Sequence, residues 1–337
     1  MKTNDWFRLT LSRTALALIL LSLSPFYAAG AGKPYRVGIV LPDDEWASSV
    51  VGLKEGLKAL GYGESKDVVY LFDNAKGDKN RISETAKKFV ADKVDAIYTV
   101  TNTALKIVIE ATRASKTPVV FGSASGPAES GVVKGYVTPD THVTGVTSGS
   151  IELVAKRLEI LKEVLPSARK IAAIGDLESD SSKAAFLLAE KTSLKVGLAL
   201  REIRIKSKDE AVEEARQLTR KETDAIFLIP GLYSVGAVNG VAAQARSARI
   251  PFAVYQIEHV RIPGALLSYG SSYHLDGKQS AALLDKVLKG TQPGQLPIER
   301  PRQHQLVLNL DTAMDIGIKF SPQSINRADE IIGGAKR

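Results

Sequence analysis

The chain has 337 residues, of which 45 are Lys or Arg and 37 are Asp or Glu, and its formal net charge is +8. The basic residues are interspersed with acidic ones rather than gathered in one block, which disfavours a nucleic-acid-binding protein. The absence of cysteine excludes disulfides and cysteine-ligated metal sites, and it removes the acceptor for a bacterial lipoprotein anchor.

The first 31 residues have the order typical of a secretory signal peptide. Arg8 and Arg13 precede an apolar run at 15–23, and small residues follow at 28–31. The apolar run is too short to span a membrane comfortably. We therefore expect cleavage after Ala31 and a free, unlipidated protein in the periplasm. An uncleaved membrane anchor is the alternative interpretation.

Strand-like and helix-like segments alternate through the first half of the mature chain. Continuous apolar runs are typical of strands buried on both faces, and apolar residues at helical spacing lie between them. This alternation predicts a parallel sheet built from βαβ units. The predicted strands are Tyr35–Leu41, Val68–Phe72, Ala96–Val100 and Pro118–Ser123, and the predicted helices are Ser48–Gly61, Asn80–Lys93 and Thr103–Ser115.

The same alternation restarts in the second half of the chain, which predicts a second sheet of the same kind. The predicted strands there are Ile171–Gly175, Leu198–Ile205, Ala225–Ile229 and Pro251–Tyr255, and the predicted helices are Ser181–Leu194, Lys208–Arg220 and Val235–Ala248.

Three segments are predicted to cross between the two halves, near 139–151, at Ala265–Ser271 and after the proline-rich stretch Gln292–Pro301. A long amphipathic helix at His274–Gly290 is expected to return to the first half. A strand at Leu306–Leu310 and a short helix around Asp311–Gly317 are expected near the end.

The predicted fold is therefore α/β, with two doubly wound parallel-sheet lobes joined by a multi-strand hinge. We expect lobe 1 to comprise residues 35–145 and 270–298, and lobe 2 to comprise residues 146–269 and 299–332. A ligand cleft is expected between them, at the carboxyl ends of the strands.

A series of short motifs in a fixed order resembles the family of bacterial ABC-transporter substrate-binding proteins that includes tryptophan and tyrosine uptake receptors. The resemblance extends from about Tyr35 to Ile318, and its stronger pieces include Gly52–Gly61, Thr117–Phe121, Val143–Val146 and Val287–Gly290. It implies the type I periplasmic-binding-protein fold, a small-molecule solute, and an ABC permease in the inner membrane as partner. We expect a monomer that binds no nucleic acid.

The candidate solute-binding residues follow the predicted strands, begin the predicted helices, or lie where the resemblance implies a binding loop. They are Trp46, Asn102, Thr103, Ser123, Ser125, Ser181, Ser182, Tyr233, Ser272 and Tyr273. Trp46 would stack on a flat ligand, or belong to an ordinary surface turn. The serines, and Asn102 or Thr103, have an alternative interpretation as turn or helix-cap residues.

Three positions depart from the family pattern. Amino-acid-binding members carry an acidic residue where this chain has Gly126, Gly231 and Ser272. An ammonium group buried without an acceptor is costly. We therefore expect an aromatic, neutral or anionic solute rather than an ordinary α-amino acid.

Common catalytic and metal-binding motifs are missing from the sequence. The four histidines are far apart, and no pair has the spacing of a zinc-binding helix. Glu178 and Asp180 could form a paired-carboxylate site, but a solvated loop is the better interpretation. We expect a receptor without cofactor, metal or enzymatic activity. The alternatives are a receptor for a membrane sensor kinase or chemoreceptor, and an exported α/β enzyme.

Overall fold

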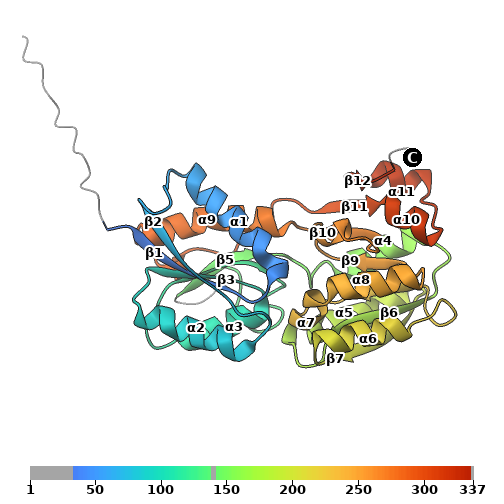
Figure 1. Cartoon of the computed structure of the whole chain (residues 1–337), viewed down its shortest axis with the longest axis horizontal. Coiled ribbons are helices and arrows are strands. Elements are labelled where there is room, and N and C mark those ends of the chain that lie inside the picture. The colour runs from blue at the N-terminus through green and yellow to red at the C-terminus, as the bar shows by residue number, and fades with distance from the viewer. Residues whose placement is uncertain (1–32, 138–141, 335–337) are drawn as a thin grey trace, which may run out of the picture. The chain divides into compact units, whose positions relative to one another are not determined.

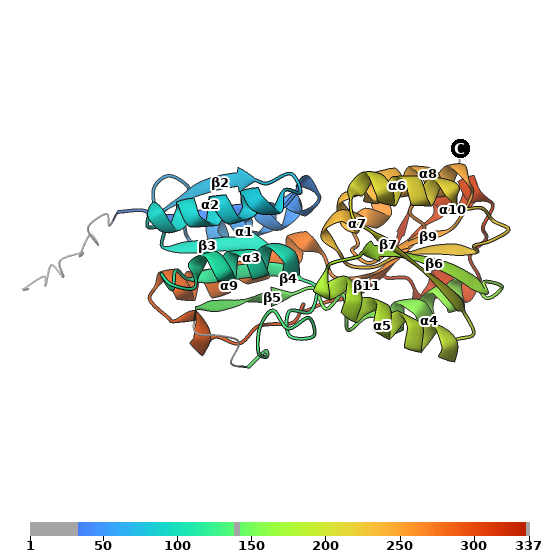
Figure 2. The same ribbon diagram turned by 90° about the horizontal axis from the view of Figure 1, so that it is seen from below.

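The structure is a computed structural model that describes residues 33–137 and 142–334. From Pro34 on, the chain forms one compact unit. This unit contains two sheets, each covered by helices, which we call lobe 1 and lobe 2 (Figures 1 and 2). The predicted α/β fold class is confirmed. The predicted signal peptide, and the part of the first crossing at 138–141, lie outside the described residues.

Lobe 1 has a five-stranded parallel sheet with the order β2-β1-β3-β4-β5. Helices α2 and α3 pack on one face, and α1 and α9 pack on the other. The strands are β1 (Tyr35–Leu41), β2 (Val68–Asn74), β3 (Ala96–Val100), β4 (Val119–Ala124) and β5 (Val143–Thr147). The helices are α1 (Ala47–Ala59), α2 (Lys79–Ala91), α3 (Asn102–Thr112) and α9 (Tyr273–Leu288).

Glycines explain how α9 is fixed to α1, although the two helices are far apart in sequence. A Cβ atom at Gly52 would lie 1.9 Å from the His274 carbonyl oxygen, and one at Gly277 would lie 1.9 Å from the Ser49 carbonyl oxygen. Any side chain at these positions would force the helices apart. Gly52 and Gly56 of the Gly52–Gly61 motif therefore serve helix packing.

Lobe 2 has a seven-stranded sheet with the order β12-β11-β10-β9-β8-β6-β7, in which only the β10–β11 pair is antiparallel. The strands are β6 (Lys170–Asp176), β7 (Ala199–Ile205), β8 (Ala225–Leu228), β9 (Phe252–Val254), β10 (Leu267–Gly270), β11 (Gln305–Asn309) and β12 (Glu330–Ile332). The helices are α4 (Val154–Val164), α5 (Asp180–Lys195), α6 (Lys208–Gln217), α7 (Leu232–Gly236), α8 (Val238–Ser247), α10 (Leu310–Ile316) and α11 (Pro322–Arg327).

Two parts of lobe 2 differ from the sequence prediction. The helix predicted at Val235–Ala248 is divided into α7 and α8, and α7 begins earlier because the Asp176 carboxylate accepts its first N–H groups. A cap supplied by a distant strand leaves no local signal. The sequence analysis also did not predict α4, α11 or β12, which has only three residues.

Three connections join the sheets, and they leave the lobes in direct contact. One links β5 to α4, one links β10 to α9, and one precedes β11. The third contributes a bridge in which Glu299 lies beside β5, with its N–H 2.9 Å from the Gly145 oxygen. In the part of the chain that the structure covers, no helix is both long and apolar enough to cross a bilayer.

Candidate functional site

A narrow cavity lies where strands of the two lobes end against each other, and its volume is about 10 Å³. Its wall on lobe 1 consists of Trp46, Thr101, Asn102, Thr103 and Ser125. Its wall on lobe 2 consists of Ser181, Gly231, Leu232 and Tyr255. Each of these residues follows a strand or begins a helix, which is the position at which open α/β sheets bind ligands.

Two long helices begin at this cavity, one from each lobe. Helix α3 begins with Asn102 and Thr103, and α5 begins next to Ser181. The first N–H groups of a helix have no partner inside the helix and carry partial positive charge. The site therefore offers donors to an anionic group such as a carboxylate.

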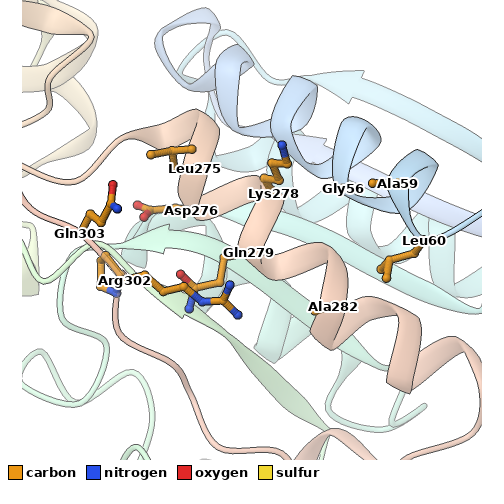
Figure 3. A pocket seen from close by; sticks show the side chains of 11 residues that line it. Gly56, Ala59, Leu60, Leu275, Asp276, Lys278, Gln279, Ala282, Arg302 and Gln303 are labelled. Carbon is orange, nitrogen blue, oxygen red and sulfur yellow. The ribbon is translucent and has the colours of Figure 1, made fainter.

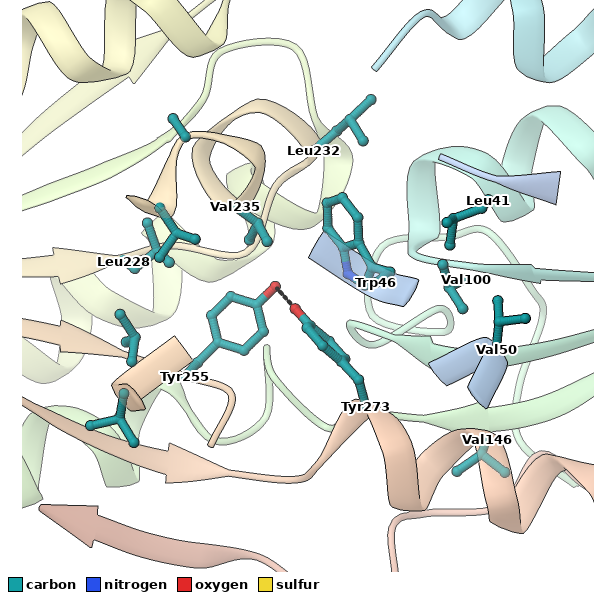
Figure 4. Close-up of a cluster of buried hydrophobic side chains, with 14 of the residues drawn as sticks. Leu41, Trp46, Val50, Val100, Val146, Leu228, Leu232, Val235, Tyr255 and Tyr273 are labelled. Atoms are coloured by element: carbon teal, nitrogen blue, oxygen red, sulfur yellow. Dashed lines mark hydrogen bonds between the residues drawn. The ribbon is translucent and has the colours of Figure 1, made fainter. Parts of the chain in front are cut away.

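An aromatic group forms the inner part of the site (Figure 4). The Tyr255 and Tyr273 hydroxyls are 3.3 Å apart, and the Tyr273 ring centroid is 6.2 Å from that of Trp46. All three side chains are at most 2% exposed and belong to one hydrophobic cluster that includes residues of both lobes, such as Leu232. The lobes are therefore closed on each other through aromatic side chains.

A second, more open pocket of about 170 Å³ adjoins the cavity and shares Asn102, Thr103 and Ser181 with it. Asp176, the last residue of β6, also lines this pocket and is 4% exposed. Its carboxylate accepts the N–H groups of Tyr233 and Ser234, each at 2.9 Å.

Burial raises the pKa of the Asp176 carboxyl, and the backbone N–H groups oppose that change. The sequence indeed lacks acids at 126, 231 and 272. Asp176 nevertheless supplies a carboxylate to the adjoining pocket.

Gly231 and Asp176 share one space in the cleft. A Cβ atom at Gly231 would lie 2.3 Å from the Asp176 Oδ1 atom. An acidic side chain at 231 and the present position of Asp176 therefore exclude each other. A comparison made position by position along the chain cannot detect that Asp176 fills the space next to Gly231.

Five of the predicted site residues line the cavity, namely Trp46, Asn102, Thr103, Ser125 and Ser181. Tyr273 packs behind them against Trp46. Tyr233 lies at the interface of the lobes, where the Lys79 ammonium is 5.1 Å from its ring centroid.

The hydroxyls of Ser123, Ser182 and Ser272 do not line the cavity, because each has a structural partner. Ser182 donates to the Pro230 oxygen at 2.7 Å and accepts from the Asp176 N–H. Ser123 donates to Asp276 at 2.8 Å, and Ser272 donates to Glu258 and caps α9. Ser272 therefore has the cap role that the sequence analysis named as the alternative, whereas Ser123 and Ser182 bind atoms of neighbouring segments.

The sequence analysis missed Thr101, Leu232 and Tyr255, as well as Asp176. All four end or follow a predicted strand, so their position was the available signal. Thr101 has φ 67° and caps α3 by accepting the Ala104 N–H. Glu178 and Asp180 also line the adjoining pocket, but Asp180 pairs with Lys106 of the other lobe.

Another concave region lies outside the cleft, along α1 and α9 beside the segment 301–303 (Figure 3). Its volume is about 380 Å³, and no predicted site residue lines it. Among the described residues there is no group of three or more His, Asp or Glu side chains arranged to hold a metal ion.

Comparisons with known proteins agree with this architecture. A tyrosine-binding protein from Clostridioides difficile is 27% identical over 289 residues, which cover 85% of this chain and 82% of that protein. A domain from Streptococcus pneumoniae solved in complex with L-Trp has a TM-score of 0.81 at 22% identity, covering 89% of this chain and all of that one. A ligand-free, open substrate-binding protein from Clostridium difficile has a TM-score of 0.64 at 22% identity, covering 88% of this chain and 99% of that one.

The family model described as ABC transporter substrate binding protein matches residues 36–332. That range includes both sheets and every residue of the cavity. The chain therefore belongs to the family of ABC transporter substrate-binding proteins.

Proposed function

We propose that the mature protein is a periplasmic receptor that closes over an aromatic amino acid and presents it to an ABC permease without catalysing a reaction. The observation that supports this most is the cavity between the lobes, in which aromatic side chains lie beside the N-termini of α3 and α5. An aromatic amino acid has both a flat apolar ring and a carboxylate, which match the chemistry of these walls. The closed cavity of about 10 Å³ is too small to hold it, so in this proposal the lobes open to admit the solute and close around it.

The solute expected from the sequence needs correction. One relative is named for tyrosine and another was solved with L-Trp, so the exclusion of ordinary amino acids finds no support. In our proposal the aromatic ring lies against Trp46 and Tyr255, and the carboxylate receives N–H groups at Thr103 and Ser181. The polar contacts fix the orientation of the solute, and the ring contributes most of the buried apolar area.

Closure of the lobes is the proposed signal to the permease. In this proposal the bodies that move are residues 35–145 with 270–298 and residues 146–269 with 299–332. The described lobes are in contact at the cleft, where Asn239 donates to Glu45 at 2.9 Å and Lys106 pairs with Asp180. The higher TM-score to the L-Trp complex than to the ligand-free, open protein is consistent with a closed form.

Export through removal of residues 1–31 is part of the same proposal. The basic, apolar and small segments of this stretch support it. Fractionation of cells that express the full chain tests it, together with the mass of the released protein. A protein that stays in the membrane fraction with an intact N-terminus would contradict cleavage.

Isothermal titration calorimetry of the purified mature protein tests the solute class. The panel contains L-tryptophan, L-tyrosine, L-leucine and myo-inositol. We expect micromolar or tighter binding of at least one aromatic amino acid and weaker binding of the other two solutes. Solution scattering should show a smaller radius of gyration with the bound solute than without it. Failure of both aromatic amino acids to bind would overturn the proposal.

A further inference from the structure

The second connection between the lobes is very short. Only Ser271 and Ser272 separate the end of β10, in lobe 2, from the start of α9, in lobe 1. The chain on either side is tightly packed, since Cβ atoms at Gly270 and Gly277 would lie 1.8 and 1.9 Å from backbone oxygens. Closely packed segments move as units. The two serines therefore absorb a rotation of one lobe against the other at this connection.

Each of these serines donates a hydrogen bond to an acidic side chain. The Ser271 hydroxyl lies 2.9 Å from the Asp276 Oδ2 atom, and the Ser272 hydroxyl lies 2.6 Å from the Glu258 Oε1 atom. The two acids belong to different lobes, because Asp276 is part of α9 and Glu258 lies between β9 and β10.

The surroundings of Asp276 favour its neutral form. Its side chain is 1% exposed, and its donors are the hydroxyls of Ser271 and Ser123, both of which bond to Oδ2. This arrangement leaves Oδ1 for a proton. Two neutral donors compensate poorly for the burial of a full negative charge. Burial accordingly raises the pKa of the Asp276 carboxyl well above its ordinary value, although the two hydroxyls oppose that change.

The ionisable groups that face Asp276 supply no compensating cation. Repulsion by Glu258 of lobe 2 raises the Asp276 pKa further, and Tyr98 of β3 is itself an acid. Lys278 and Arg302 line the groove beside Asp276 (Figure 3), but neither pairs with it within residues 33–137 and 142–334.

Glu258 reaches from lobe 2 to the start of α9. Its Oε1 atom accepts the Ser272 hydroxyl and the His274 N–H, the latter at 3.2 Å. The His274 ring does not neutralise it, because that ring contacts Glu55 of α1. Since Glu258 and α9 belong to different lobes, a rotation at the crossing moves this acid away from Asp276.

We infer that this crossing is a proton-linked hinge, in which Asp276 holds a proton while the lobes are closed and loses it when they open. The inference uses the closure that the proposed function includes, and it adds the proton as a second ligand of the closed form. In the open form Glu258 has moved away with lobe 2 and water reaches the Asp276 carboxyl, so the ionised carboxylate is favoured. Closure therefore takes up a proton, and acidic pH favours the closed form.

Solute affinity should follow the same proton. Because the pKa of Asp276 is higher in the closed form, affinity is greatest below the pKa of the open form. It then falls by up to about tenfold per pH unit and becomes constant above the pKa of the closed form. His259 acts in the opposite direction, since burial lowers its pKa from 6.5 to about 4. Measurements between pH values of about 6.5 and 8.5 avoid its titration.

Calorimetry of the mature protein with L-tryptophan tests the proton uptake. Titrations in two buffers with different enthalpies of ionisation give the number of protons that the protein takes up on binding. For the wild type we expect net uptake near neutral pH and an affinity that falls as the pH rises.

Asp276→Asn replaces the protonated acid by a neutral amide that retains an acceptor for the serine hydroxyls. Proton uptake should disappear, and affinity should become independent of pH. At a pH of about 8 the variant should bind L-tryptophan about 3- to 10-fold more tightly than the wild type does. Damage to the hinge alone would weaken binding at every pH.

Two further variants separate charge from structure. Glu258→Gln retains an acceptor at the start of α9 and removes the repulsion, so the fall in affinity should begin at a lower pH. The matched control is Asp285→Asn, which makes the same chemical change on the same helix at an acid bound by Tyr62 and Lys289. It should retain the wild-type pH dependence.

Solution scattering of the free protein tests the hinge without any solute. The radius of gyration of the wild type should increase as the pH rises from about 6.5 to 8.5, whereas that of Asp276→Asn should stay at the smaller value. Thermal unfolding shows whether each variant folds. If Asp276→Asn does not fold, the shift expected for Glu258→Gln decides the test.

Binding of L-tryptophan without proton uptake, together with scattering that does not depend on pH, would overturn the inference and leave the proposed receptor intact. Proton uptake that persists in Asp276→Asn would overturn it as well. If neither L-tryptophan nor L-tyrosine binds, the proposed function is wrong, and scattering of the free protein still decides whether the hinge is linked to a proton.

Discussion

The ammonium group of Lys208, in lobe 2, forms an ion pair with the buried carboxylate of Asp43, in lobe 1. The lysine side chain passes between two glycines, since Cβ atoms at Gly77 and Gly236 would lie 3.3 and 2.9 Å from its Cε atom. Asp43 also accepts the Asp44 N–H at the start of the turn that carries Trp46. The pair therefore joins the lobes and supports a wall of the cavity.

Replacement of Lys208 by Met should favour the open form. In the closed form the substitution leaves the Asp43 carboxylate, whose side chain is 5% exposed, without its cation. The open form is not penalised in this way, because there the two lobes are apart. We expect apparent solute affinity to fall about tenfold and the free protein to have a larger radius of gyration in solution scattering. Lys156→Met removes a surface pair within lobe 2 and is the control; an equal loss there would contradict the assignment.

Gly236→Ala should act through the same ion pair. The new methyl group would lie 2.9 Å from the Lys208 Cε atom, so the lysine must move away from Asp43. We expect weaker solute binding in the single variant and no further loss when Lys208→Met is added, since both changes remove one interaction. Additive losses in calorimetry would show that the glycine has a separate role. Gly135→Ala, which meets no atom within 4 Å, is the matched control.

Trp46 should report solute binding through its fluorescence. The sequence has two tryptophans, and the other, Trp6, belongs to the stretch that we expect to be cleaved. Trp46 is 1% exposed and lines the cavity, so opening or filling of the cleft changes its surroundings. Titration with L-tyrosine, with excitation that only tryptophan absorbs, should shift the emission. An unchanged spectrum at a concentration that calorimetry shows to be saturating would contradict this placement.

The strands and most helices were predictable because apolar runs and helical spacing are local properties of the sequence. The site was only partly predictable. Position after a strand identified Asn102 and Ser125, whereas Ser182 occupies an equivalent position and bonds to the Pro230 oxygen instead. The hydrogen-bond partner of a serine hydroxyl depends on which segments the fold brings next to it, and the local sequence does not contain that information. For the same reason the proximity of Asp176 to Gly231 was not apparent from the sequence.

His259 should make the protein less stable at acidic pH. Burial lowers its pKa from 6.5 to about 4, and its ring packs edge-on against Tyr255 and Tyr273. The unfolded chain therefore binds a proton at this histidine more readily than the folded chain does. The contribution of neutral, buried His259 to the free energy of unfolding is fully present above pH 6.5 and is lost as the pH falls towards 4. At a pH of about 4.5, the loss is on the order of 2–3 kcal/mol.

His259→Phe keeps an aromatic ring and removes the titration. Denaturant unfolding at neutral and acidic pH should show a smaller loss of stability in the variant than in the wild type. Asp176 and Asp276, whose pKa values burial raises, act in the opposite direction but are present in both proteins. An identical acid dependence in the two proteins would contradict the prediction.

Arg157 should be dispensable for stability although it is buried. It is 2% exposed, burial lowers its pKa to about 9, and its Nε and Nη1 atoms have no hydrogen-bond partner in the described part of the chain. Its charge is offset by a bond to the Ser150 oxygen and by the rings of Tyr255 and Phe227, at 5.2 and 5.7 Å. Neutral contacts of this kind compensate poorly for the desolvation of a cation.

Arg157→Met retains much of the side-chain volume without the charge, so we expect the free energy of unfolding to stay the same or to rise by about 1–2 kcal/mol. The lowered pKa still lies above neutral pH, so the guanidinium remains charged in both states and the difference should be constant between pH values of about 5 and 8. Denaturant unfolding measures this difference in the free energy of unfolding. Arg201→Met, at an exposed arginine, is the control. A loss of more than about 2 kcal/mol would mean that the aromatic rings and Ser150 stabilise the charge more than its burial costs.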